Sequence, residues 1–216
     1  LFEDHEIKFD IGRKSIQGRQ ATIYKKFAKV IFNDFLKYVS KYVAGDVSPD
    51  DQWDRDEVFA EVEGIIPLGN SKIFFEKCPK DQEASVAALF YECIGKGIIK
   101  GITPIISGYR NRYDLYVRIG NKRRIIEFKS KLRNVIKDFS DQRKMFDQVD
   151  CIVCWNVDDE DRQAFSNVAI EICPIIQNTL TQGDAPFPSA SYKLELSGFV
   201  KPIYVIDLFL VLSALD

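Results

Sequence analysis

Histidine is nearly absent from the sequence, in which His5 is the only one among 216 residues. This scarcity argues strongly against catalytic sites that depend on histidine, such as Ser-His-Asp hydrolases, Cys-His proteases and histidine-rich zinc centres. An enzyme built from this chain must instead use carboxylates, lysine, arginine and hydroxyl groups. Carboxylates suit Mg²⁺, which takes oxygen ligands and keeps several of its waters.

Long apolar runs are also missing. The sequence has no stretch of about 18 apolar residues and no signal-peptide pattern. These absences predict a soluble, intracellular protein, cytoplasmic or nuclear, with no membrane partner. The formal net charge is only −2, so no global field attracts a polyanion and any basic surface must be local. Because the chain begins with Leu1, we expect it to be part of a larger protein.

The five cysteines include one C-x-x-C pair, Cys151 and Cys154, in the stretch "CIVCW". Such a pair can be half of a zinc site or a redox couple. Here it lies in an apolar, strand-like run, and the sequence has no second C-x-x-C. Buried free cysteine behaves as a small hydrophobic residue, so the pattern predicts core packing.

The N-terminal third has a different pattern from the rest. Apolar residues recur at helical spacing over residues 20–43, with lysines on the other face, which predicts one amphipathic helix. Residues 46–63 are strongly acidic, and we interpret them as a solvated loop followed by a short helix. Residues 1–65 are therefore predicted to be an N-terminal helical extension, which could serve for homodimerisation or for docking a partner domain.

The remainder of the chain alternates helical and strand-like segments. A helix after Asp81 as N-cap is followed by a strand within 98–109 and a hairpin over 113–132 that turns at Gly120-Asn121. The pattern then predicts a helix over 137–148, a buried strand over 149–157, a solvated loop over 158–165 and a strand near 168–176. A polar loop over 178–191 and a strand running into a terminal helix complete it. This order predicts an α/β fold for residues 66–216, with a mixed central β-sheet flanked by helices.

The hairpin carries the residues of greatest chemical interest. Alternate residues of a strand share a face, so Glu127 and Lys129 point one way while Phe128 points the other. Asp114 opens the partner strand and can lie near the same end of the sheet. Two carboxylates there could hold a divalent cation, and Lys129 could orient a water molecule or neutralise charge on a phosphate. The alternative is an ordinary hairpin with surface charges.

The surroundings of the hairpin favour the metal-site interpretation. Glu83 occupies the first turn of the preceding helix, where its carboxylate could join the same cluster. Between residues 108 and 137 ten basic residues face only two acidic ones, a local charge of +8 that is typical of a phosphate-binding surface. The basic residues are Arg110, Arg112, Arg118, Lys122, Arg123, Arg124, Lys129, Lys131, Arg133 and Lys137. Arg110 and Arg112, just before Asp114, are candidates for contacts to backbone phosphates or are ordinary solvated loop charges.

At Glu83, Asp114, Glu127 and Lys129 the sequence resembles the PD-(D/E)xK nuclease superfamily. That family pattern is a helix with an acid, then a hairpin with Asp on one strand and E-x-K on the next. The resemblance covers about residues 70–216, and its layout is similar to that of restriction enzymes and archaeal junction resolvases. One departure is Tyr113, which stands where the family pattern has proline.

The resemblance implies a restriction-endonuclease-like fold and a metal-dependent nuclease that hydrolyses phosphodiester bonds, with DNA favoured over RNA. It implies Mg²⁺ or Mn²⁺ held by Asp114 and Glu127, a supporting ligand in Glu83, and a water molecule positioned by Lys129. Gln142 would be a supporting polar residue on the helix that follows the hairpin.

Two other functions are compatible with the same residues. The chain could be a nucleic-acid-binding module that has lost cleavage, although retention of both Glu127 and Lys129 counts against this. It could also be a docking or regulatory domain that uses the N-terminal helix. A nucleotide hydrolase fits worst, because "GKGIIKG" at residues 95–101 lacks the hydroxyl and the spacing of a phosphate-binding loop.

Overall fold

The computed structural model describes residues 19–31, 55–175 and 187–215 and separates the chain into two compact units, residues 1–63 and 64–216. In the first unit, α1 spans Arg19–Ile31 and α3 spans Arg55–Glu63. The apolar side chains of Ile23, Phe27 and Val30 in α1 are exposed. The helix predicted over 20–43 is thus present as far as residue 31. Residues 32–43 and the acidic residues 46–54 lie outside the described part.

The second unit is built on a seven-stranded mixed sheet in the order β1-β2-β3-β4-β7-β6-β5. Strands β3, β4 and β7 run parallel to one another in the centre, and the pairs on either side of them are antiparallel. The strands are β1 (Thr103–Ser107), β2 (Leu115–Ile119), β3 (Lys122–Lys129), β4 (Cys151–Cys154), β5 (Ile170–Pro174), β6 (Tyr192–Leu196) and β7 (Ile203–Asp207).

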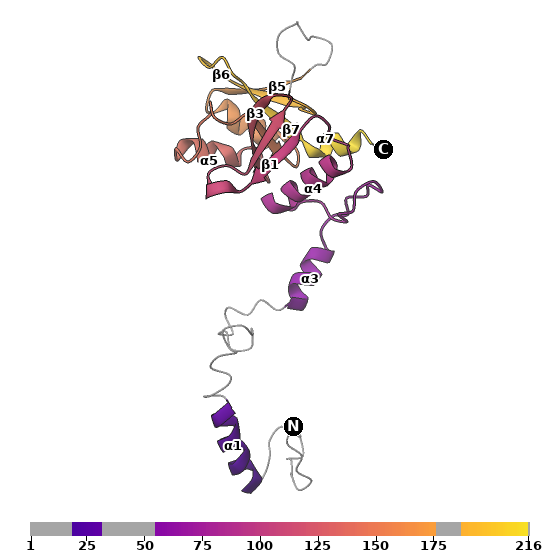
Figure 1. Cartoon of the computed structure of the whole chain (residues 1–216), viewed down its shortest axis with the longest axis vertical. Coiled ribbons are helices and arrows are strands. Elements are labelled where there is room, and N and C mark those ends of the chain that lie inside the picture. Colours follow the sequence, from indigo (N-terminus) through magenta and orange to yellow (C-terminus); the bar gives the residue numbers. More distant parts are fainter. Residues whose placement is uncertain (1–18, 32–54, 176–186, 216) are drawn as a thin grey trace. The chain divides into compact units, whose positions relative to one another are not determined.

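Helices cover both faces of this sheet (Figure 1). Buried residues of α4 (Glu83–Gly95) and α7 (Leu208–Ser213) share one core with one face of the central strands. Buried residues of α5 (Asn134–Ser140) and α6 (Asp159–Ser166) share a second core with the opposite face. The predicted α/β class with a mixed sheet flanked by helices is confirmed.

The alternation of side chains along β3 places Glu127 and Lys129 on the α5 side. Ile126 and Phe128 pack in the core shared with α4, where the ring centroid of Phe128 lies 5.5 Å from that of Phe90. Ile125 packs in the core shared with α5. Because successive side chains of a strand point to opposite faces, Glu127 and Lys129 are directed with Ile125 toward the α5 side.

Two predictions about the helices around the hairpin are wrong. Asp81 is not the N-cap of α4, because Gln82 occupies that position and Asp81 forms an ion pair with Lys131, 3.0 Å between oxygen and nitrogen. The helix predicted over 137–148 ends at Ser140, and turns follow it. Strand β6 is an element that the sequence pattern does not predict, and it begins directly after the loop predicted over 178–191.

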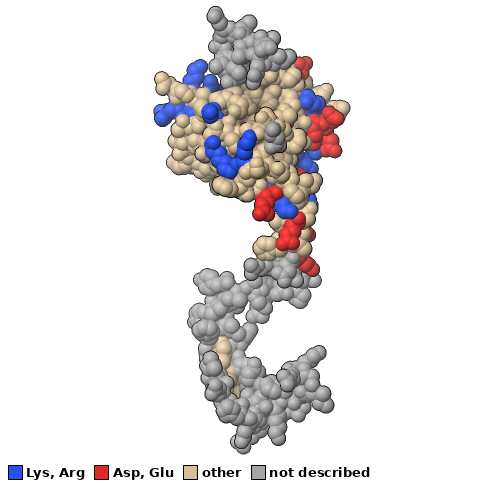
Figure 2. All heavy atoms as spheres, turned by 90° about the vertical axis from the view of Figure 1, so that its right-hand side faces the viewer, with Lys and Arg blue, Asp and Glu red and all other residues tan. Residues whose placement is uncertain are grey.

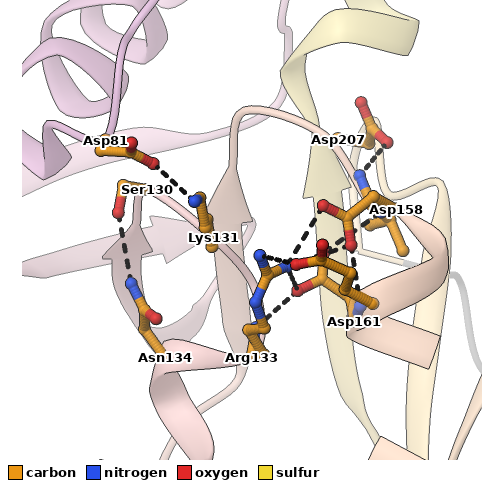
Figure 3. A network of polar contacts seen from close by, with 10 residues as sticks. Asp81, Ser130, Lys131, Arg133, Asn134, Asp158, Asp161 and Asp207 are labelled. Atoms are coloured by element: carbon orange, nitrogen blue, oxygen red, sulfur yellow. Dashed lines mark hydrogen bonds and ion pairs between the residues drawn. The ribbon is translucent and has the colours of Figure 1, made fainter. Parts of the chain in front are cut away.

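The segment 158–165, predicted to be a solvated loop, is largely the helix α6. Asp158 accepts a hydrogen bond from the backbone N–H of Asp161, and Asp161 accepts one from the backbone N–H of Asp158, which together form a capping box. Arg133, immediately before α5, pairs with both of these acids (Figure 3). Asp161 is 1% exposed. The acidic run is therefore a structural link between α5 and α6.

The cysteine prediction is confirmed. The five cysteines are free, and Cys93, Cys151 and Cys154 are buried. Burial raises the pKa of the Cys151 and Cys154 thiols well above the ordinary value. Cys151 and Cys154 are the first and last residues of β4, at the centre of the sheet. Within the described residues, no helix is long and apolar enough to cross a membrane.

Candidate active site

Asp114 and Glu127 meet at one end of the β2–β3 hairpin. Leu115 pairs with Ile126 in the antiparallel ladder, so Asp114, one residue before β2, lies opposite Glu127. The Asp114 Oδ2 atom accepts a hydrogen bond of 2.8 Å from the backbone N–H of Phe128. This bond fixes the Asp114 carboxylate against the next strand and brings two of the predicted ligands together.

The cation between these carboxylates is Lys144. Its Nζ atom forms an ion pair with Glu127 Oε2 and lies 3.8 Å from Asp114 Oδ1. Lys144 belongs to the turns that follow α5, a segment that the sequence pattern had assigned to a helix. No pattern in the sequence distinguishes this lysine from the other basic residues near the hairpin.

Glu127 is enclosed completely, with 0% of its surface exposed. Its Oε1 atom is buried and has no hydrogen-bond partner in the described structure. Burial raises the pKa of Glu127 to about 8, and the nearby Asp114 carboxylate adds to this effect, while Lys144 opposes it. Burial disfavours the ionised form because it removes water from the carboxylate. The Glu127 Oε1 atom is therefore available to coordinate a cation.

Lys129 lies next along the same face of β3 and has different partners. Its Nζ atom is 3.2 Å from Glu83 Oε1 and 3.1 Å from Asp138 Oδ2, and the residue is 6% exposed. Burial alone would lower the pKa of the ammonium group, but the two carboxylates outweigh burial and the pKa is raised. Lys129 therefore carries its charge throughout the neutral range. Asp138, on α5, was not identified from the sequence.

The three predicted metal ligands do not converge on one point. Among the described residues, the ligand atoms of Glu83, Asp114 and Glu127 do not all lie within 4.8 Å of one another. Glu83 begins α4 and its carboxylate contacts Lys129. The structure therefore places Glu83 beside the lysine and leaves Asp114 and Glu127 as the pair that shares a cation.

A small cavity of about 230 Å³ lies beside Asp114 and Glu83. Ala87, Tyr91 and Phe128 give it an apolar wall. Its rim includes Gly108, whose φ of 66° is in the left-handed region that glycine adopts easily. The backbone N–H of Gly108 donates a hydrogen bond of 2.9 Å to the Asp114 carbonyl oxygen, which closes the loop between β1 and β2. Asp114 thus contributes to the lining of a cavity on the α4 side of the hairpin.

Arg110 and Arg112 are exposed in this closed loop. Arg110 lies in a short 3₁₀ turn, Tyr109–Asn111, and Arg112 Nη2 is 3.4 Å from Gln148 Oε1. Gln142 is two residues beyond the end of α5, with an exposed side chain and a φ of 54°. The prediction that Gln142 lies on a helix is therefore wrong.

Part of the basic surplus is used within the fold. Arg124, Lys129, Lys131 and Arg133 form ion pairs with acidic residues. No acidic partner is found in the described structure for Arg110, Arg112, Arg118, Lys122, Arg123 and Lys137. Figure 2 shows that lysine and arginine side chains form patches on the visible face of the core.

A second group of potential metal ligands lies at the opposite edge of the sheet. Glu171, Cys173 and Glu195, on β5 and β6, have ligand atoms within 4.8 Å of one another. Lys193 forms an ion pair with Glu195, and the Cys173 Sγ atom lies 3.6 Å from the Glu195 Oε2 atom. Both glutamates are exposed, and exposed acidic groups of this kind occur commonly without a metal ion.

The chain was also compared with known proteins. No family model, no curated protein and no solved structure matches it.

Proposed function

We propose that the chain is a nuclease on a restriction-endonuclease-like fold that hydrolyses phosphodiester bonds with Mg²⁺ or Mn²⁺ and favours DNA over RNA. The observation that carries this proposal is the pairing of two carboxylates around one cation position. Asp114 and Glu127 share Lys144, and Lys129 is the next residue on the same face of β3. Acid, acid and lysine thus occupy adjoining positions at one end of a hairpin.

The residues present fit a hard divalent cation. Asp114 and Glu127 would hold it, because both carboxylates already face a positive charge and Glu127 Oε1 is buried without a partner. Such an ion, when bound, lowers the pKa of a coordinated water and stabilises charge on a phosphate. Glu83 would act on the site through Lys129, which it contacts directly.

Lys129 would act as a fixed positive charge and hydrogen-bond donor. Its raised pKa keeps the ammonium group protonated at neutral pH, which disfavours a role as general base. Glu83 and Asp138 hold Nζ from two different helices. A positioned ammonium can orient the attacking water and stabilise the charge that grows on the phosphate.

Two arginines on the face of the sheet that carries Glu127 define a proposed binding path for the nucleic acid. Arg118 of β2 lies directly opposite Arg123 of β3. Both share the face of Glu127, because side chains two residues apart on a strand share a face. At about 3.3 Å per residue, Arg118 lies about 13 Å along the strand from Asp114. Like charges placed opposite each other destabilise a sheet, and a bound phosphate would relieve this repulsion.

Removing these two charges tests the path. In the Arg118→Gln/Arg123→Gln variant we expect weaker binding to a DNA duplex and a salt dependence whose logarithmic slope falls by about 2, because two phosphate contacts are lost. Fluorescence anisotropy over a range of salt concentrations measures both quantities. An Arg162→Gln/Lys193→Gln variant removes the same charge near the opposite edge and should keep the wild-type slope. Equal slopes in all three proteins would contradict the path.

The proposed function itself is tested with several substrates in parallel. The purified chain is incubated with supercoiled plasmid, end-labelled single-stranded DNA and end-labelled RNA, each with Mg²⁺, Mn²⁺ or EDTA. We expect cutting of DNA that requires a divalent ion and stops in EDTA. If the chain binds these substrates but leaves them all intact with either ion, the nuclease proposal fails and a binding or docking role replaces it.

A further inference from the structure

Lys144 occupies the place where the proposed function requires a metal ion. Its Nζ atom pairs with Glu127 and lies 3.8 Å from Asp114 Oδ1, and the ring centroid of Tyr113 is 5.9 Å away. These contacts bring the ammonium group to both carboxylates at once. Two ionised carboxylates so close repel each other, and Lys144 places a positive charge beside both of them.

The other lysine of the site is not available for this task. Lys129 is held at 3.2 Å by Glu83 and at 3.1 Å by Asp138, and no ion pair joins it to Asp114 or Glu127 in the described structure. The two lysines are thus divided between two pairs of acids. Each has its own position, and only that of Lys144 coincides with the pair of proposed metal ligands.

The backbone that carries Lys144 suits a side chain that has to move. Lys144 lies between the end of α5 at Ser140 and the start of β4 at Cys151, in a segment of turns and bends. The Lys144 backbone N–H donates a hydrogen bond of 3.2 Å to the Asp138 carbonyl oxygen, so the ammonium group would move by rotation of the side chain with the backbone in place. Glu127, in contrast, lies within β3, where it pairs with Ile152 of β4, and is 0% exposed.

We propose that Lys144 is a tethered cation that holds the metal position in the metal-free protein and is displaced when Mg²⁺ or Mn²⁺ binds. This inference rests on the proposed function and deepens it, because it adds a regulatory residue to the same site. Lysine and metal compete for Asp114 and Glu127, so the ammonium group sets the metal concentration at which the site fills. The Lys144 side chain thereby raises the metal concentration that cleavage requires.

Binding of Mn²⁺ alone tests the competition without any need for cleavage. Free Mn²⁺ is titrated by electron paramagnetic resonance in the presence of the whole chain as wild type, Lys144→Met, Lys144→Arg and Asp114→Asn. We expect Lys144→Met to bind Mn²⁺ about tenfold more tightly than wild type. In wild type the Lys144 side chain would occupy the site in most molecules, and the apparent affinity for Mn²⁺ is reduced to the fraction of molecules in which the site is open. Lys144→Arg keeps the charge and should bind as wild type does. Asp114→Asn should lose the binding.

Thermal melting shows whether the variants are folded and how stable they are. Loss of the ammonium group leaves the buried Glu127 Oε2 atom without its partner, so Lys144→Met should melt below wild type in EDTA. Mn²⁺ should then raise its melting temperature by more than it raises that of wild type, since tighter binding stabilises the folded state more.

The outcomes separate this inference from the proposed function. If Mn²⁺ binding depends on Asp114 but Lys144→Met binds no more tightly than wild type, the competition is refuted and the nuclease proposal stands. If neither wild type nor Lys144→Met binds Mn²⁺, or if binding survives Asp114→Asn, the metal site is refuted and both proposals fail together.

Discussion

Replacement of Lys129 by methionine is expected to lower the rate of metal-dependent cleavage by about a hundredfold or more, as removal of a preorganised charge at a reacting phosphate does in other enzymes. Methionine keeps much of the length and the apolar part of the side chain but has no ammonium group. Glu83 and Asp138 would lose their partner, yet both remain in partial contact with water, so the fold should persist. Single-turnover cleavage with a saturating concentration of Mg²⁺ gives the rate.

Lys131→Met is the matched control for this measurement. Lys131 lies two residues further along the chain, and its ion pair with Asp81 is exposed. Exposed pairs contribute little to stability, so this variant should cleave as wild type does and melt within a few degrees of it. Equal rates for Lys129→Met and Lys131→Met would show that Lys129 has no part in the reaction.

Replacement of Glu127 by glutamine is expected to abolish cleavage and to stabilise the metal-free protein at alkaline pH. The pKa of Glu127 is about 8 in the folded protein, against an ordinary value of 4.5, and burial is the largest cause. Between these two pH values the folded state keeps a proton that the unfolded state loses. The free energy of unfolding of wild type therefore falls as pH rises from 4.5 to 8. Glutamine has no such proton and avoids this loss.

Urea unfolding in EDTA at pH 5 and pH 8 measures the effect. The stability gained by Glu127→Gln relative to wild type should be larger at pH 8 than at pH 5, by about 1 to 3 kcal/mol. Cleavage by the variant should fall about a thousandfold, because one metal ligand is lost. Glu195→Gln, an exposed acid on β6, controls for removal of a negative charge. A gain of the same size at both pH values would mean that Glu127 is ionised in the folded protein at pH 5.

The hairpin was predictable because its signals are local. A strand alternates its side chains, and Gly120-Asn121 marks the turn, so the sequence places Glu127 and Lys129 on one face and Asp114 at the same end. The buried strand β4 and the link from β7 to α7 follow from apolar runs of the right length. These parts depend on neighbours within a few residues of one another.

The partners of the site were not predictable, because they depend on how distant segments pack. Asp138 and Lys144 lie in a polar stretch with no distinctive spacing, and only the packing of α5 and the turns after it brings them to β3. Likewise, the acidic residues at the start of α6 have the pattern of a solvated loop. Only the fold brings Asp158 to Arg133, which lies 25 residues earlier in the sequence. Charge patterns alone do not reveal which charges are paired.

The Asp114 carboxylate, as a metal ligand in a cleaving enzyme, is the central element of the proposed site. The decisive measurement is the rate of nicking of supercoiled plasmid by wild type and by Asp114→Asn, with Mg²⁺ and with EDTA. Asparagine can still accept the hydrogen bond from the Phe128 N–H, so the hairpin should stay intact while the negative charge is lost. We predict cutting by wild type that requires Mg²⁺ and a rate for the variant that is lower by about a thousandfold. Nicking by Asp114→Asn at the wild-type rate would contradict the account.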